Sequence, residues 1–243
     1  MKRFPSEFDA LLDRNSSNDL LGLKRSRPSL RREKLAWYPN LVSEHRAKAV
    51  CRFLQSSFSD VLKPYRCPIP KSAIERMEVT ASEELPKTMS CRSAMLNSPR
   101  SRASKTAKAT GLSALLRSDS LRQVAEAVSG KKLEDDPGCQ VICYEPGDYV
   151  GPHNDHHPEY AHLRAGYVDV HLMFSTPSVQ QQFLIYEKGG YLNNVVDVSI
   201  RSAMSISLLP FWHCVTPLVS KPGSDRFARR WLLLASYCIS SKR

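Results

Sequence analysis

The residue types with the most evident chemistry are His153, Asp155 and His213. Residues i and i+2 of an extended segment point to the same side of the chain, so His153 and Asp155 can hold one ion together. A histidine from a distant strand would complete two imidazoles and one carboxylate on one face of a metal. Such a set leaves the opposite face open, which suits non-haem Fe(II) that must also bind a cosubstrate and oxygen. Because a bare His-x-Asp tripeptide is more often a surface turn, the surrounding sequence has to decide.

The sequence around these residues has the pattern of short strands. Residues 139–144 are typical of a strand, and Pro146-Gly147 forms a tight turn before the His-x-Asp pair. His213 follows the alternating segment 203–209, and a last predicted strand, 229–238, begins with arginines. Both metal-binding stretches are therefore predicted to lie within β-structure.

In their order along the chain, these motifs resemble the core of the Fe(II)- and 2-oxoglutarate-dependent oxygenase superfamily. They are Tyr-x-Pro-Gly at 144–147, His-x-Asp at 153–155, Gly-Gly at 189–190, His-x-Val-x-Pro at 213–217 and the arginine at 230. The resemblance covers roughly residues 36–240, with its motifs between 139 and 238. It does not resolve the prolyl-hydroxylase-like branch from the AlkB-like branch.

The resemblance implies that His153, Asp155 and His213 are the iron ligands and that Arg230 binds the distal carboxylate of 2-oxoglutarate. Arg230 follows His213 by 230 − 213 = 17 positions, a spacing similar to that of AlkB-type members. A guanidinium is suited to this role because it is planar, always charged and bidentate. Tyr144 is the second predicted cosubstrate residue; the alternative is an ordinary strand tyrosine.

Two other arginines compete with Arg230 for the carboxylate. Strand alternation puts Arg229 and Arg230 on opposite faces, and both faces are apolar afterwards, so periodicity leaves the choice open. Arg226 is more typical of a solvated basic turn. The superfamily's frequent Arg-x-Ser pair is absent, since Leu232 occupies its second position.

Further histidines compete for the metal. His156 and His157 follow Asp155 directly, but His156 cannot share a face with both His153 and Asp155 without a bend. We therefore expect His156 either to pack behind the metal ligands or to lie in a substrate loop. Asp169 and His171 share one face of the predicted strand 166–174, where they either line the pocket or form a hydrogen-bonded pair.

Composition favours one globular domain in a reducing compartment. The chain has 243 residues, 42% of them hydrophobic, and its seven cysteines lack the paired spacing of a disulfide framework. It contains no apolar run long enough to span a membrane and no signal-peptide core at residues 1–7. The predicted location is the cytoplasm, or the nucleus if the source is eukaryotic, and no membrane partner is expected.

The net charge of +11 is concentrated in two serine-rich segments, 24–34 and 87–108. Such segments are typical of mobile, solvated chain, and their charge could also attract nucleic acid through its phosphates. No aromatic residues stand between the charges to stack on bases. Residues 1–34 are accordingly predicted to be a basic, flexible extension, and residues 35–243 the oxygenase domain.

Within that domain, residues 35–138 are predicted to give helical support with a mobile basic loop near 87–110, and residues 139–243 the β-helix core. Helices are indicated after Ser43 and between Ser120 and Gly130. Short strands are indicated at 139–144, 166–174, 182–187, 195–200, 203–209, 213–218 and 229–238. This pattern predicts a mainly β protein with supporting helices (α+β), and the resemblance implies a double-stranded β-helix, or jelly-roll, core.

The resemblance therefore implies a dioxygenase with Fe(II), 2-oxoglutarate and O2, which hydroxylates a protein side chain or small molecule and releases succinate and CO2. An AlkB-like nucleic-acid demethylase is one alternative, although Ser236 stands where those enzymes commonly carry a second arginine. A second alternative is a non-catalytic basic β-helix protein that binds nucleic acid. A zinc hydrolase is a third, with only Glu159 and Asp169 near enough in sequence to serve as a general base.

Overall fold

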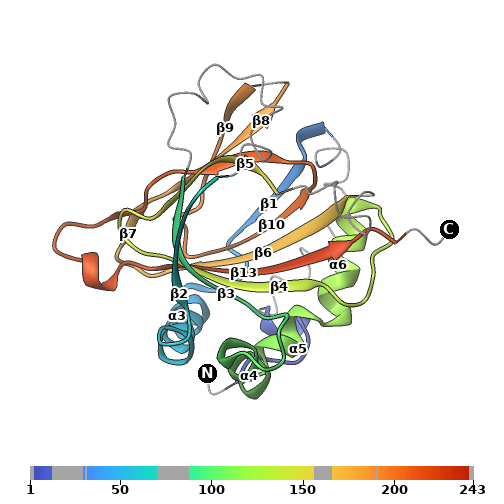
Figure 1. Ribbon diagram of the computed structural model, residues 1–243, viewed down its shortest axis with the longest axis horizontal. Coiled ribbons are helices and arrows are strands. Elements are labelled where there is room, and N and C mark those ends of the chain that lie inside the picture. Colours follow the sequence, from blue (N-terminus) through green and yellow to red (C-terminus); the bar gives the residue numbers. More distant parts are fainter. Residues whose placement is uncertain are drawn as a thin grey trace.

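A large antiparallel sheet dominates the protein. In the computed structural model, the described residues are 3–12, 30, 32–69, 88–155, 166–189 and 191–240. Eleven strands within these ranges form one sheet, which Figure 1 shows curled around a central space. Its order is β1 (Leu35–Pro39), β10 (Ser202–Leu208), β6 (Tyr167–Ser175), β13 (Arg230–Cys238), β4 (Gly138–Tyr144), β3 (Thr88–Met95), β5 (Tyr149–Asn154), β11 (Trp212–Val215), β8 (Phe183–Lys188) and β9 (Tyr191–Asp197).

The remaining strands extend this arrangement. β2 (Lys63–Pro68) pairs with β3, and the short strands β7 (Val179–Gln181) and β12 (Val219–Ser220) form a separate pair. Strands that are distant in sequence become neighbours: β13 lies between β6 and β4, and β11 lies between β5 and β8. This curled, antiparallel sheet with a few helices confirms the predicted jelly-roll fold class.

Four helices cover the outer face of the sheet (Figure 1): α3 (Glu44–Phe58), α4 (Arg102–Thr110), α5 (Leu112–Leu116) and α6 (Asp119–Ser129). Ser43 caps α3 as predicted, because its side chain accepts a hydrogen bond from the Arg46 N–H. The N-cap of α6 is Ser118, two residues before the predicted Ser120. Gly130 ends this helix in a left-handed conformation. No helix among the described residues is long and apolar enough to cross a membrane.

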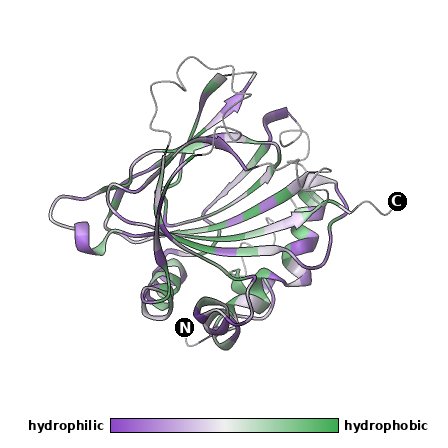
Figure 2. Ribbon diagram, viewed as in Figure 1, coloured by the Kyte–Doolittle hydropathy of each residue, from purple (hydrophilic) through white to green (hydrophobic). Residues whose placement is uncertain are grey.

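Alternation along the central strands separates the two faces of the sheet, and Figure 2 shows hydrophobic and hydrophilic residues alternating there. On β6 and β13 the outward residues are large, apolar and buried under the helices: Val168, Val170, Leu172, Phe174, Trp231 and Leu233. The inward residues include the polar side chains Asp169, His171 and Arg230. The outer face therefore builds the core, and the inner face is left for a site.

Two basic regions differ from the predictions. The predicted loop near 87–110 is wrong for residues 88–95 and 102–110, which form β3 and α4. β3 is held by strands on both sides, and α4 begins at the N-cap Ser101, so tertiary pairing overrides the composition. At the N-terminus, Phe4 and Phe8 are buried in the main core, so residues 3–12 are packed against the domain. Most of segment 24–34 lies outside the described residues.

Candidate metal and cosubstrate site

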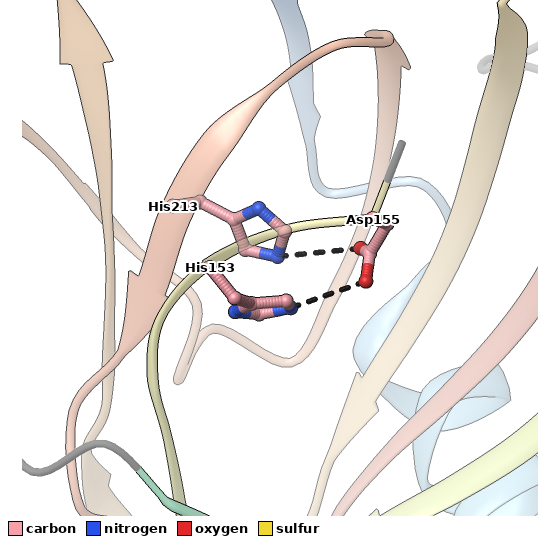
Figure 3. A group of neighbouring side chains, drawn as sticks. All are labelled: His153, Asp155 and His213. Carbon is pink, nitrogen blue, oxygen red and sulfur yellow. Dashed lines mark ion pairs between the residues drawn. The ribbon is translucent and has the colours of Figure 1, made fainter. Parts of the chain in front are cut away.

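The pairing of β5 with β11 brings the three predicted ligands together. His153 on β5 is the direct register partner of His213 on β11, and Asp155 follows the end of β5. One potential ligand atom from each of the three lies within 4.8 Å of the others, and Figure 3 shows the three side chains converging. The imidazole ring centroids are 4.3 Å apart. Spacing brings His153 and Asp155 together, whereas only sheet register adds His213.

Backbone carbonyls orient both imidazoles toward the carboxylate. The Nδ1 of His153 lies 2.8 Å from the Gly151 carbonyl oxygen, and the Nδ1 of His213 lies 3.1 Å from that of Phe211. A carbonyl can only accept, so each Nδ1 carries the proton and each Nε2 presents its lone pair. The Nε2 atoms lie 3.2 Å and 3.8 Å from the two Asp155 carboxylate oxygens.

The protonation preferences of this group suit a cation. Burial lowers the pKa of His213 to about 4, and the neighbouring His153 adds to this effect. Burial raises the pKa of Asp155, but His153 and His213 outweigh it and hold this pKa below its usual value. Burial lowers the pKa of His153, but Asp155 outweighs it, so this pKa is raised. A metal ion at this position would compete with a proton for the His153 imidazole.

The donor set fits a first-row transition metal with vacant positions. Such an ion holds nitrogen and oxygen ligands at about 2.0–2.2 Å, so three ligands on one face lie about 3 Å apart, close to the separations found here. Two neutral imidazoles and one carboxylate are the ligands of open Fe(II) sites. The side chains of His153 and His213 are largely buried, whereas 41% of the Asp155 side chain is exposed toward the cavity.

That cavity has a volume of about 1010 Å³ and is lined by the inner face of the sheet. At one end, Arg230 begins β13 with its side chain inside; only 1% of the residue is exposed. It makes no ion pair with any described carboxylate, and its Nη2 has no hydrogen-bond partner among the described residues. Burial lowers the pKa of Arg230, but a guanidinium remains charged in proteins. A buried, unpaired cation of this kind calls for an anion.

Two neighbours fix the Arg230 side chain. The Tyr144 ring lies 4.3 Å from the guanidinium carbon, in cation–π geometry, and Tyr144 is the register partner of Arg230 on β4. The Arg230 Nε donates a 2.5 Å hydrogen bond to the Gln182 side-chain oxygen. Gln182 is fully buried and its amide nitrogen donates to the Thr216 and Asp148 carbonyls. Nothing in the sequence signalled Gln182, because its role depends on a contact across 48 positions.

The structure separates Arg230 from its two competitors. Arg229 points to the other face, where its Nε lies 3.0 Å from a Glu145 carboxylate oxygen. Arg226 lies over the exposed ring of Phe227. Neither lines the cavity, so Arg230 is the arginine that the cavity presents to a ligand.

Asp169 and His171 both line the cavity, which resolves one alternative left open by strand alternation. Burial lowers the pKa of His171 to about 3, so this imidazole is neutral at physiological pH. His156 and His157, together with the remaining loop positions up to 165, lie outside the described residues. The same holds for Gly190 of the Gly-Gly motif, whereas Gly189 ends β8 in a turn.

Comparison by sequence finds neither a matching family model nor a matching curated protein. Comparison by structure finds many matches. A Pseudomonas putida prolyl-4-hydroxylase matches with a TM-score of 0.54 at 13% identity, covering 90% of this chain and 99% of the other. A Trichoplax adhaerens prolyl hydroxylase, solved with a hypoxia-inducible-factor peptide, matches with a TM-score of 0.54 at 14% identity, covering 95% and 96%.

The non-haem α-ketoglutarate-dependent epimerase SnoN of nogalamycin biosynthesis matches with a TM-score of 0.57 at 12% identity, covering 90% and 84%. The chain has the fold of the 2-oxoglutarate–Fe(II) oxygenases. At these identities the likeness concerns the fold alone, and it agrees with the resemblance carried by the motifs. Neither the motifs nor the structural matches distinguish a prolyl-hydroxylase-like chain from an AlkB-like one.

Proposed function

We propose that this protein is an Fe(II)- and 2-oxoglutarate-dependent dioxygenase that hydroxylates a protein side chain or a small molecule. The observation that carries the proposal is the presence, in one cavity, of a His-Asp-His group and a buried arginine without an ion-pair partner among the described residues. A metal-binding module alone has no need of the arginine. A structural zinc site would instead favour a closed tetrahedron of four ligands.

In this proposal His153, Asp155 and His213 hold the iron, and the iron with 2-oxoglutarate supplies the oxidising chemistry. One oxygen atom of O2 enters the substrate C–H bond, and the other enters succinate as 2-oxoglutarate loses CO2. Asp155 supplies a carboxylate where related halogenases have a small residue that admits halide, so the expected outcome is hydroxylation or demethylation through hydroxylation. Residues 35–243 would form this oxygenase domain.

Arg230 in this proposal binds the distal carboxylate of 2-oxoglutarate. Its Nε is already held by Gln182 and its face by Tyr144, so the terminal nitrogens are the groups left to form a bidentate pair. Fixing the guanidinium before binding reduces the conformational entropy that the ligand must overcome. The largely apolar lining of the cavity would limit the access of water to the reacting groups.

Protein and small-molecule substrates are both represented among the structural neighbours. One is titled as a complex with a hypoxia-inducible-factor peptide, and another as SnoN with Fe3+, α-ketoglutarate and a nogalamycin compound. A nucleic-acid substrate is less well supported, because Ser236 occupies the place of a second arginine and part of the basic loop forms ordered structure. Seven free cysteines fit a reducing location, for which we propose the cytoplasm.

The decisive experiment is an anaerobic titration of metal-free protein with Fe(II) and then 2-oxoglutarate, monitoring the weak visible charge-transfer band of the chelate. Wild-type protein is expected to develop the band, and His213→Ala is expected to lose it because two ligands hold Fe(II) poorly. His45→Ala serves as the matched control, because His45 lies on α3 away from the cavity. Absence of a band in folded wild-type protein would refute the proposed function.

A further inference from the structure

The end of the β6–β13 strand pair opposite Arg230 carries a second buried ionisable group that the proposed function does not use. Asp169 on β6 is only 3% exposed, and its Oδ1 has no hydrogen-bond partner among the described residues. No described lysine or arginine forms an ion pair with it. Asp169 nevertheless belongs to the residues that line the cavity.

Hydroxyl groups surround this carboxyl on the neighbouring strands. In the sheet register, Asp169 stands between Ser207 of β10 and Ser236 of β13. In the adjacent row, Ser205 pairs with His171, and the Ser205 hydroxyl is buried and has no hydrogen-bond partner among the described residues. Adjacent strands lie about 4.8 Å apart, so these side chains form one continuous oxygen-rich patch. All of them line the same cavity.

An unpaired carboxyl in such a place is costly to ionise. Burial is the main cause that raises the pKa of Asp169 to about 8, Asp155 adds to the effect, and a hydrogen bond from Ser236 opposes it. A polar group without partners in a buried site costs free energy that a complementary ligand would recover. For Arg230 the complement is an anion, and for Asp169 it is a cation.

We propose that the patch formed by Asp169, Ser205, Ser207 and Ser236 binds a primary ammonium group of the prime substrate. Three N–H donors on a compact cation match one carboxylate with small hydroxyls on the two neighbouring strands, whereas the broad fork of a guanidinium requires a wider face. A quaternary ammonium would require an aromatic cage, and the patch is built from serines instead. That the bound amine is the prime substrate rests on the proposed function; the ammonium site itself does not.

The patch also limits where oxidation can occur. Asp169 lies two positions from His171 along β6, or about 7 Å, and both His213 and Asp155 affect the pKa of His171. A ligand with its ammonium group at Asp169 would therefore need a short alkyl chain to reach the metal-binding group. A free alkylamine and a lysine side chain both offer this chemistry.

The test is ligand-observed NMR on the 243-residue chain with five probes. n-Butylammonium is compared with n-butanol and butyrate, and N-acetyl-lysine methylamide with its norleucine counterpart. We expect the two amines to bind and the uncharged and anionic counterparts to bind at least about tenfold more weakly, as for loss of a charge-assisted hydrogen bond. Binding of butylammonium alone would indicate a small-molecule source, and binding of the lysine probe a protein source.

Variants then locate the binding. Asp169→Asn, which preserves shape, is expected to weaken amine binding about tenfold or more, and Ser205→Ala to weaken it less. Ser175→Ala is the matched control. Ser175 is as buried as Ser205, and its hydroxyl has no hydrogen-bond partner among the described residues. It lies on β6 like Asp169, but at the other end, where it pairs with Arg230. Equal binding of butanol and butylammonium, or unchanged binding in Asp169→Asn, would overturn the proposal.

The same samples are titrated with Fe(II) and 2-oxoglutarate. Amine binding without formation of the chelate would refute the proposed function while supporting the ammonium site. Chelate formation without amine binding would do the reverse. Retained chelate formation in Asp169→Asn is expected, because Asp169 is outside the metal-binding group.

Discussion

The two ends of the cavity wall are built on the same strands, β6 and β13, but each holds its buried ionisable side chain, Arg230 or Asp169, in different surroundings. At one end, Arg230 is held by the Tyr144 ring and the Gln182 amide, so its position is fixed before any ligand arrives. At the other end, Asp169 is flanked by the small residues Ser207 and Ser236, which line the cavity with it. β6 and β13 run through both ends.

This difference indicates what each end is suited to bind. A rigidly held cation among large side chains suits one ligand of fixed shape, such as the proposed cosubstrate 2-oxoglutarate. At the Asp169 end, substitution of only a few of the small serine side chains would change the shape of the site and so the ligand that it fits. The His-Asp-His group lines the same cavity as both ends.

The largest difference is expected from removing the charge at the fixed end. Arg230→Ala should weaken 2-oxoglutarate binding about 100-fold, because a bidentate, charge-assisted pair is lost from a buried site. Arg229→Ala is the neighbouring control; Arg229 pairs with Glu145 outside the cavity and its loss should change affinity less than about twofold. Isothermal titration of the Fe(II)-loaded protein measures both. Equal effects of the two variants would contradict the assignment of Arg230.

At the other end, the largest expected effect concerns stability against pH. The pKa of Asp169 is raised to about 8 by burial, so the folded state binds a proton that the unfolded state releases near pH 4. Wild-type stability relative to Asp169→Asn should therefore fall as pH rises from 4 to 8, by up to about 1.4 kcal/mol per pH unit. Urea unfolding of both proteins across this range measures the difference. A constant difference would show that Asp169 is ionised in the folded protein.

A smaller effect is expected from releasing the Arg230 side chain without removing its charge. Gln182→Ala should weaken 2-oxoglutarate binding about fivefold, because the guanidinium loses the hydrogen bond that orients it. Gln181→Ala is the control, since Gln181 is the preceding residue and is exposed. Both affinities are measured in the titration used for Arg230. If the two variants behave alike, Gln182 has no orienting role.

The smallest effect is expected from removing only the hydroxyl of the aromatic neighbour. Tyr144→Phe retains the ring over the guanidinium and should weaken 2-oxoglutarate binding about twofold, whereas Tyr144→Leu should weaken it more because the cation–π contact is lost. A loss in Tyr144→Phe as large as in Tyr144→Leu would assign the contribution to the hydroxyl instead of the ring.

Local patterns predicted much of the fold because they are themselves local. Helix α3 begins after its cap Ser43, and the alternating segments correspond to β4, β6, β8, β10 and β13. β3 was missed because its sequence is polar and basic, and its strand form depends on pairing with β2 and β4. The tight packing of Phe4 and Phe8 was missed for the same reason, since the surface they contact is distant in sequence.

The sequence by itself determined the residue types of the site and the spacing that places His153 and Asp155 on one side of an extended segment. Only the tertiary structure decided that His213 joins them, because the register of β5 with β11 is a long-range pairing. It also decided that Arg230 and not Arg229 lines the cavity, since the two faces of β13 are equally apolar and become different only when helices cover one of them. The unpaired carboxyl of Asp169 likewise follows from burial, which a linear pattern does not contain.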